Sequence, residues 1–251
     1  MQNGKKIYFA SDVHLGAPSI SNAKQHERTF VSWLDSISET AESIYLLGDI
    51  FDFWFEYKKV VPRGYTRLLG KLSELTDKGI PIHFFTGNHD IWVFDYLPKE
   101  TGVQVHHKPL ELNFDGKLFY LAHGDGLGSY DKKFNLLKIL FTNKLAQWVF
   151  SHIHPNWGIG LATFWSGKSR EKNLVKYGSV YLGDQKEWLV LYSKEYLKHK
   201  HIDYFIYGHR HIVLDLNLNT KSRLIYLGDW VNLFTYGVWD GLNFKLEYYK
   251  S

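Results

Sequence analysis

Carboxylate, amide and imidazole side chains gather in five short segments spread along the chain. These segments are Asp12-Val13-His14, Gly48-Asp49, Gly87-Asn88-His89-Asp90, His123-Gly124-Asp125 and Gly208-His209-Arg210-His211. An Asp-x-His pair alone arises often by chance, but the five segments together do not. Oxygen and imidazole nitrogen atoms bind manganese, iron and zinc, so the segments predict a metal centre.

Each segment directly follows a short apolar run that is typical of a β-strand. The runs cover residues 7–10, 44–47, 82–85, 118–122 and 204–207. Polar groups that follow neighbouring strands meet in one crevice at the carboxyl edge of a sheet. The glycines permit sharp turns that bring backbone and side chains close to an ion. We therefore expect all five segments to converge on one site.

The first half of the chain alternates strands with helices. Residues 22–41 and 64–78 carry apolar side chains at helical spacing, for example Phe30, Trp33 and Leu34 in the first of them. This alternation predicts right-handed crossovers and a largely parallel sheet up to about residue 126.

The last part of the chain has a different pattern. Residues 212–218 and 223–227 are strand-like, and residues 231–238 and 242–249 flank the turn Trp239-Asp240-Gly241. Asp-Gly between alternating strands is typical of a hairpin, so we predict an antiparallel meander that extends or packs on the first sheet. The fold class that follows is a layered α/β sandwich of mixed β-sheets flanked by helices.

Residues 127–200 are mostly helical in pattern and predict an insertion over the site, within a single domain of residues 1–251. Residues 132–150 and 186–200 are the clearest helices in it. The first has a broad apolar arc bordered by lysines. Such a helix either packs into the fold or rests in a membrane interface, and the pattern allows both.

Composition excludes several kinds of protein. The chain of 251 residues has no cysteine, which removes disulfides, thiolate zinc sites and cysteine nucleophiles. No apolar stretch reaches the roughly 20 residues that span a bilayer. The start, Met-Gln-Asn-Gly-Lys-Lys, lacks a signal region, so we expect a cytoplasmic protein, with peripheral contact to the inner membrane left open. A net charge of +4 without a recognition motif gives no support for nucleic-acid binding.

Taken together, the five segments resemble those of the calcineurin-like metallophosphoesterase superfamily over nearly the whole chain. The resemblance implies two divalent metal ions, with manganese expected first and iron or zinc as alternatives. The first ion would be bound by Asp12, His14, Asp49 and His211, and the second by Asp49, Asn88, His123 and His209. Asp49 would bridge both ions, and a hydroxide between them would attack phosphorus.

Two further roles follow from the same resemblance. His89 would be catalytic together with Asp49, because the superfamily uses this histidine as a proton donor to the leaving group. Asp90 would orient a neighbouring histidine.

A narrower resemblance is to the UDP-2,3-diacylglucosamine pyrophosphatases of lipid A biosynthesis. It is carried by Asp12-Val13-His14-Leu15, by the eight residues from Leu47 to Trp54, and by His-Gly-Asp followed by an insertion. Within the insertion, Ser169, Asn173 and Lys176 match the family spacing Ser-x-x-x-Asn-x-x-Lys. The residues that the resemblance places on the substrate are Asn88, His89, Asp131, Ser169, Asn173, Lys176 and His209.

This resemblance implies hydrolysis of UDP-2,3-diacylglucosamine at the α-phosphorus, which releases UMP and 2,3-diacylglucosamine 1-phosphate (lipid X). The insertion would house the acyl chains. Two positions depart from the family. This chain has Gly-Asn-His-Asp in place of Gly-Asn-Arg-Asp, and it has Phe134 where the family has tyrosine, which removes a possible hydroxyl contact. His89 either indicates another nucleotide diphosphate or phosphodiester, or supplies the positive charge of the arginine. A non-catalytic scaffold of the same fold is a third interpretation, which the complete ligand set disfavours.

Overall fold

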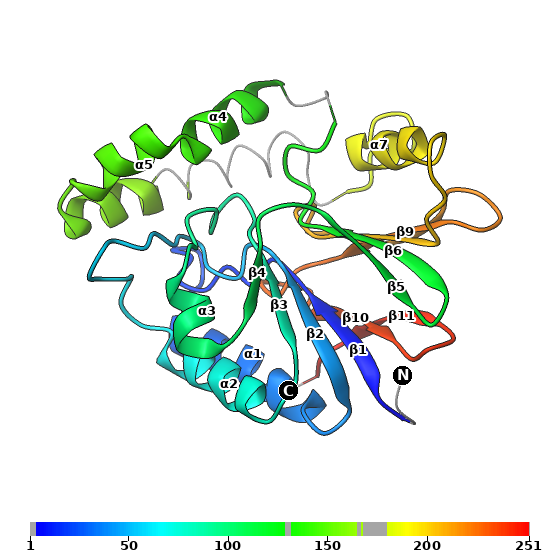
Figure 1. Ribbon diagram of the computed structural model, residues 1–251, viewed down its shortest axis with the longest axis horizontal. Helices are drawn as coiled ribbons and strands as arrows, with labels where there is room; N and C mark the ends of the chain where they lie inside the picture. Colours follow the sequence, from blue (N-terminus) through cyan, green and yellow to red (C-terminus); the bar gives the residue numbers. More distant parts are fainter. Residues whose placement is uncertain (1–3, 129–131, 165–166, 168–179, 251) are drawn as a thin grey trace.

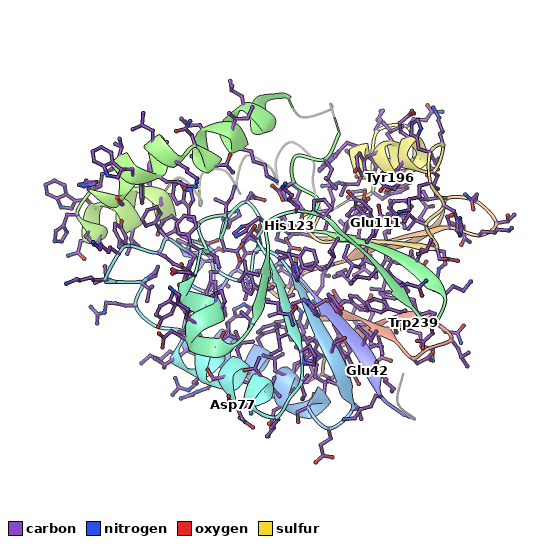
Figure 2. All side chains as sticks on the ribbon, in the orientation of Figure 1. Glu42, Asp77, Glu111, His123, Tyr196 and Trp239 are labelled. Carbon is purple, nitrogen blue, oxygen red and sulfur yellow. The ribbon has the colours of Figure 1, made fainter. Side chains whose placement is uncertain are left out.

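Two β-sheets pack face to face in the computed structural model, which describes residues 4–128, 132–164, 167 and 180–250 (Figure 1). Side chains fill the layer between the sheets (Figure 2). Phe9 lies at its centre, with its ring 5.4 Å from Tyr45 in the first sheet and 6.3 Å from Phe119 in the second. Helices lie on the outer faces, so the predicted layered α/β sandwich of mixed sheets is confirmed.

The first sheet has six strands in the order β11-β10-β1-β2-β3-β4. Their bounds are β1 Lys6–Ala10, β2 Ala41–Leu47, β3 Ile82–Phe85, β4 Gln104–His106, β10 Thr235–Trp239 and β11 Phe244–Tyr248. The strands β1 to β4 are parallel, as predicted, whereas β10 and β11 are antiparallel. The helices α1 (Ala23–Ile37), α2 (Thr66–Asp77) and α3 (Tyr96–Thr101) cover its outer face.

The second sheet has five strands in the order β5-β6-β7-β9-β8. Their bounds are β5 Leu110–Phe114, β6 Lys117–Ala122, β7 Tyr204–Tyr207, β8 Val213–Asn217 and β9 Arg223–Leu227. The three inner strands are parallel, and β5 and β8 are antiparallel edges. Helix α7 (Trp188–Tyr196) packs on this sheet through Leu189 and Val190.

The prediction of one C-terminal meander is wrong. The pairs β8–β9 and β10–β11 are antiparallel hairpins, but they belong to different sheets. Residues 228–234 carry the chain from one sheet to the other, because Trp230 is buried between Phe30 and Trp33 of α1. The Asp229 carboxylate accepts hydrogen bonds from three backbone N–H groups in this turn. The predicted strand over 231–238 therefore begins only at Thr235.

The continuous helix predicted over residues 132–150 is also wrong, because it is divided into α4 (Lys132–Thr142) and α5 (Lys144–Ser151). Asn143 between them is extended, and its side chain accepts hydrogen bonds from the N–H groups of Leu145 and Ala146. Residues 155–164 form a further helix. In Figure 1, α4 and α5 lie beyond the loops that follow the strands, apart from the sheets.

None of the helices in the described part of the chain combines the length and the apolar composition that crossing a bilayer requires.

Candidate active site

The ends of β1, β2, β3, β6 and β7 bring the five polar segments together. The side chains form three overlapping groups, and within each group the potential metal-binding atoms all lie within 4.8 Å of one another. The groups are Asp12, His14 and His211; His14, Asp49 and His89; and Asp49, His123 and His209. His123, labelled in Figure 2, lies where the strands end on the side of α4. The polar segments thus share one crevice at the carboxyl edges of both sheets.

Backbone conformation aims these side chains inward. Five of the eight described non-glycine residues with positive φ belong to the groups above: Asp12, His14, Asp49, His209 and His211, with φ between 51° and 65°. A left-handed residue costs about 1–2 kcal/mol relative to the right-handed helical region, although Asp and His tolerate it better than bulkier residues. Strained backbone conformations persist only where the surrounding structure enforces them, and they are concentrated at functional sites.

Glycines allow the turns to approach one another. A Cβ atom on Gly87 would lie 2.2 Å from Asp49 Oδ1, and one on Gly48 would lie 2.8 Å from Cγ of His123. Gly48 also has a φ of +85°. Any larger side chain at either position would therefore displace the groups that form the site.

The first group is centred on Asp12 and two facing imidazole rings. The Nε2 atoms of His14 and His211 lie 3.2 Å apart, and His211 Nε2 is 3.3 Å from Asp12 Oδ1. Each ring is oriented from behind by a carboxylate, since His14 Nδ1 lies 3.3 Å from Asp52 Oδ1 and His211 Nδ1 lies 3.2 Å from Asp229 Oδ2. Both rings therefore direct Nε2 to the centre, as metal-binding histidines do.

The group formed by Asp49, His123 and His209 lies at the other end of the site and is centred on Asp49. His123 Nε2 lies 3.3 Å from Asp49 Oδ2, 3.3 Å from Asn88 Oδ1 and 3.2 Å from Nδ1 of His209. His123 Nδ1 donates a hydrogen bond to the Leu47 carbonyl at 2.8 Å, which again leaves Nε2 for the centre. Asp49 Oδ2 is also 3.8 Å from His14 Nε2, so this carboxylate lies between the two groups.

His89 belongs, with His14 and Asp49, to the group that joins these two. Its Nδ1 lies 2.9 Å from the Asp52 carbonyl oxygen, and its Nε2 lies 4.0 Å from Asp49 Oδ2. Its backbone N–H donates to Asp49 Oδ1 at 2.9 Å. The sequence prediction that His89 adjoins the centre agrees with this placement, although its direct neighbours are Asp49, Asp52 and His14.

The prediction that Asp90 orients a histidine is wrong, because within the part of the chain that the structure describes its carboxylate forms no hydrogen bond or ion pair with one. Its carboxylate instead accepts hydrogen bonds from the N–H groups of Gly87 at 2.7 Å and Ile50 at 2.8 Å, with Asp49 and Phe51 at 3.3 Å. It ties the turn after β3 to the turn after β2. Burial and the neighbouring Asp49 charge raise the pKa of Asp90 to about 7.

The charges of the site are strongly coupled. Burial would raise the pKa of Asp12, but His211 and the hydrogen bond with His14 lower it to about 2. Burial would likewise raise the pKa of Asp49, yet His123 and His89 hold it well below its usual value. Burial alone would lower the pKa of His123, and the Asp49 charge raises it to about 10. Burial lowers the pKa values of His89 and His209 to about 4.

These residues fit a pair of divalent cations. Asp12 Oδ1 is buried and forms no hydrogen bond of good geometry among the described residues, although His211 Nε2 lies 3.3 Å and His14 Nε2 3.8 Å from it. The Nε2 atoms of His14 and His211 face each other at 3.2 Å, so the three atoms converge as the ligands of one cation would. Oxygen and imidazole ligands with oriented rings satisfy the chemistry of such ions.

An aromatic floor, formed by Phe53, Phe55 and Tyr57, extends from the site toward the insertion. These residues pack with Trp92, with Phe150 of α5 and with Ile159 of the helix over residues 155–164. The Trp92 indole N–H donates to the Phe141 carbonyl at 2.7 Å. Ile50, Phe51 and Trp54 of the same motif belong instead to the core beneath the first sheet's helices, so these apolar motif residues serve packing.

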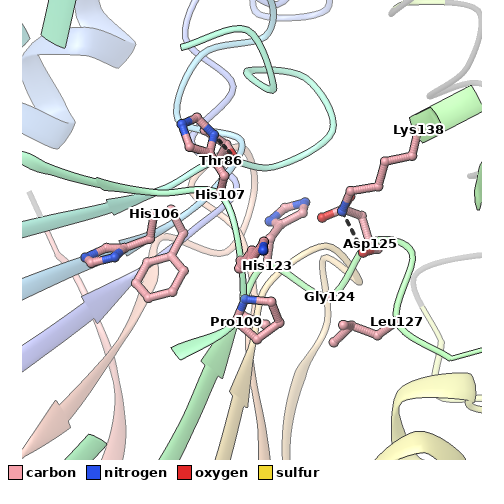
Figure 3. Close-up of a pocket in the computed structure, with 12 residues that line it drawn as sticks. Thr86, His106, His107, Pro109, His123, Gly124, Asp125, Leu127 and Lys138 are labelled. Carbon is pink, nitrogen blue, oxygen red and sulfur yellow. Dashed lines mark hydrogen bonds and ion pairs between the residues drawn. The ribbon is translucent and has the colours of Figure 1, made fainter. Parts of the chain in front are cut away.

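An ion pair joins α4 to the segment that follows β6. Lys138 Nζ lies 2.6 Å from Asp125 Oδ2 and 3.3 Å from the Asp125 carbonyl oxygen (Figure 3). Asp125 is two residues beyond His123 and is buried. The segment His123-Gly124-Asp125 therefore contacts both the centre and the insertion.

Four predicted substrate residues, Asp131, Ser169, Asn173 and Lys176, lie outside the described residues. The other predicted ones, Asn88, His89 and His209, lie at the centre.

Sequence reasoning missed the carboxylates behind the histidines. Asp52 follows Asp49 by three residues inside a motif that was already recognised. Asp229 follows β9 as Gly228-Asp229, which repeats the pattern of Gly48-Asp49 after β2. Both signals were present in the sequence.

Comparison with known proteins agrees with this geometry. The family model of calcineurin-like phosphoesterases matches residues 5–213. A UDP-2,3-diacylglucosamine hydrolase of Porphyromonas gingivalis is 43% identical and covers 96% of this chain and 97% of its own length. One of Shewanella piezotolerans is 27% identical, with 90% of each chain covered. A dimetal phosphatase structure from Danio rerio aligns with a TM-score of 0.47 at 12% identity, over 98% of this chain and 99% of that one. The match over most of its length shows that this chain is a hydrolase of the calcineurin-like phosphoesterase family.

Proposed function

We propose that this enzyme hydrolyses UDP-2,3-diacylglucosamine to UMP and 2,3-diacylglucosamine 1-phosphate. The observation that carries the proposal is a cation-binding centre beside an apolar insertion, in a chain 43% identical to a protein named for that reaction. A charged diphosphate with two acyl chains requires these two environments side by side. Residues 1–251 would form one domain with an insertion over residues 127–200.

The centre would bind two manganese ions, with iron or zinc as alternatives. Asp12, His14, Asp49 and His211 would hold the first ion, and Asp49, Asn88, His123 and His209 the second. Two divalent cations supply charge for the phosphoryl oxygens and an activated water for in-line displacement.

The chain itself orients the diphosphate and controls a proton. His89 donates from Nδ1 to the Asp52 carbonyl, so its Nε2 is directed to the reacting group. Its pKa is lowered by burial, and an anionic substrate would raise it again. With a proton on Nε2, His89 would donate a hydrogen bond to a phosphoryl oxygen, and Asn88 and His209 would flank the same group.

We assign the contacts to the head group of the substrate from the spacing of residues in the sequence. Asp131, Ser169, Asn173 and Lys176 would bind the glucosamine and its phosphates, as the spacing Ser-x-x-x-Asn-x-x-Lys indicates. Replacing Asn173 by Ala would raise the KM for the lipid substrate while leaving hydrolysis of a small phosphodiester unchanged.

The insertion would receive the acyl chains and touch the cytoplasmic face of the inner membrane. Its helices expose large apolar side chains, namely Leu136, Ile139, Leu140, Leu145, Trp148, Val149, Trp157, Leu161 and Phe164. These side chains lie on α4, α5 and the helix over residues 155–164, and apolar surface that is exposed over a wide area is uncommon on a protein that meets only water. A cytoplasmic enzyme whose product and substrate are lipids gains access to them through such a surface.

A second candidate is hydrolysis of another nucleotide diphosphate or phosphodiester, which His89 favours because the lipid enzymes carry arginine there. The test compares UMP release from UDP-2,3-diacylglucosamine with hydrolysis of UDP-glucose and of bis(p-nitrophenyl) phosphate, each with manganese. We expect a much higher kcat/KM for the lipid substrate. If UDP-glucose or the phosphodiester is hydrolysed and no UMP is released from the lipid substrate, the second candidate is the function of this enzyme.

The variant His89→Arg separates the two interpretations of His89. If the side chain only supplies positive charge, the variant retains activity toward the lipid substrate. If it supplies a proton to an alkoxide leaving group, the variant loses phosphodiester hydrolysis first, because arginine stays protonated.

A further inference from the structure

Arg210, between His209 and His211, forms a buried ion pair that the proposed reaction does not use. Its Nη2 lies 2.8 Å from Glu187 Oε1 and its Nε lies 3.0 Å from Glu187 Oε2. The exposed fraction is 5% for Arg210 and 0% for Glu187. Burial of such a pair brings little net stability, because the desolvation of both charges offsets their attraction. Its geometry therefore calls for another explanation.

The pair joins three separate parts of the chain. Glu187 also accepts hydrogen bonds from the Leu182 N–H at 3.2 Å and from the Tyr226 hydroxyl of β9 at 3.3 Å. Arg210 donates to the Val180 carbonyl at 3.4 Å. The pair thus ties the turn after β7 to β9 and to residues 180–187, the segment that leads from the insertion to α7.

Trp188 extends these contacts to the centre. The Arg210 guanidinium lies 5.2 Å from the centre of the Trp188 ring, and that ring lies 6.0 Å from the His209 ring, nearly perpendicular to it. Arginine stacked on an aromatic face and held by a carboxylate fork has little freedom. The side chain of Arg210 is therefore a fixed point from which the turn is built.

The residues on both sides of Arg210 have strained backbones. His209 has a φ of 65° and His211 a φ of 51°, and their imidazole rings belong to different groups of the centre. A turn in this conformation would relax unless other contacts held it. The contacts of its middle residue with Glu187 and Trp188 supply that restraint.

We propose that Glu187 and Arg210 are a positioning pair that fixes His209 and His211 for binding of the two divalent cations. The inference rests on the proposed metal-dependent function, but it adds two residues that touch neither the cations nor the substrate. The pair also explains why the turn after β7, which carries His209 and His211, is bonded to residues 180–187 at the end of the insertion.

The test is a titration of the protein with Mn²⁺ alone. Binding is measured by calorimetry and by the loss of the electron paramagnetic resonance signal of free Mn²⁺. Glu187→Gln keeps the shape and removes the charge. We expect it to weaken Mn²⁺ binding about tenfold, the lower end of what partners of metal ligands contribute. Arg210→Lys keeps a charge without the fork, and we expect a smaller loss. Asp215→Asn is the matched control, because it breaks the ion pair of Asp215 with Arg223 at the surface of the same sheet.

A double variant separates positioning from stability. Glu187→Leu combined with Arg210→Met removes both charges and replaces them with apolar side chains of similar volume. This double variant should fold, whereas a variant that leaves one of the two charges buried without its partner is destabilised. We expect its thermal stability to approach that of the wild type while Mn²⁺ affinity stays low. If affinity recovers together with stability, or if Glu187→Gln binds Mn²⁺ as the wild type does, the inference is wrong. If the wild type itself binds no Mn²⁺, it is the proposed function that fails.

Discussion

The metal centre and the insertion are built in opposite ways. At the centre, Asp12 and His14 are almost fully buried, and hydrogen bonds from neighbouring turns hold each ring. In the insertion, no residue of α5 is buried, and Trp157 is 77% exposed. The helices α4, α5 and 155–164 contact the body through the aromatic floor, the Trp92 hydrogen bond and the Lys138–Asp125 ion pair, whereas α7, at the end of the same insertion, packs on the second sheet. Strand ends thus fix the polar groups of the site, while the helices that precede residue 165 expose most of their large described apolar side chains.

The largest effect is expected for Asp49→Ala. This change removes the carboxylate that lies between the two groups, so hydrolysis of both lipid and water-soluble substrates should fall to background. Asp35→Ala, which removes an exposed carboxylate of α1, is the control and should leave the rate unchanged. Activity that survived Asp49→Ala would rule out the two-cation mechanism.

Asp229→Asn should have the next largest effect, because it removes the charge that orients His211. Loss of such a partner weakens metal binding about tenfold to a hundredfold. A Mn²⁺ titration of the wild type and the variant would measure it. Since the amide can still accept the N–H groups of the 228–234 turn, a similar melting temperature is expected, and unchanged Mn²⁺ affinity would contradict the role of Asp229.

Binding of Mn²⁺ should release a proton from the centre. Burial would lower the pKa of His123, but the Asp49 charge raises it to about 10, and a proton held on this imidazole must leave before its nitrogen binds a metal ion. Affinity should therefore rise with pH, by up to about tenfold per unit below the pKa. Calorimetry in buffers of different ionisation enthalpy counts the protons. Binding without proton release would show that His123 is already neutral.

Lys138→Ala probes the attachment of the insertion. Loss of the partly exposed ion pair with Asp125 should raise the KM for the lipid substrate about two- to fivefold and leave Mn²⁺ affinity unchanged. Hydrogen exchange in α4 should become faster. Lys138→Arg should retain wild-type values, and an equal loss of kcat for small phosphodiesters would instead place Lys138 within the centre.

Trp148→Ser should have the smallest effect on the enzyme itself. The side chain is 60% exposed on α5, so the free energy of unfolding should change by no more than about 0.5 kcal/mol. Hydrolysis of water-soluble substrates should not change either. Binding to vesicles of anionic phospholipid should weaken, and wild-type vesicle binding by this variant would argue against membrane contact through α5.

The two regions also differ in how well the sequence predicts them. Strands that end at a metal ligand were recognisable because an apolar run and a polar turn residue lie next to each other, as in Leu47-Gly48-Asp49. The break at Asn143 was harder to predict, since the apolar spacing continues through it and only the capping preference of asparagine indicates an end.

Long-range partners were not predictable from local pattern. Glu187 meets Arg210 across 23 residues of sequence, and nothing near either residue indicates the other. The passage of residues 228–234 between sheets likewise depends on Trp230 packing against α1, a tertiary contact that overrides the strand propensity of the segment.

UMP release from UDP-2,3-diacylglucosamine by the metal-stripped enzyme, followed as Mn²⁺ is returned, tests the central claim most directly. We expect no UMP after treatment with a chelator, and activity that returns as the site formed by the three overlapping groups takes up two ions per chain. Continued release of UMP from the stripped enzyme, or none at full Mn²⁺ occupancy, would contradict it.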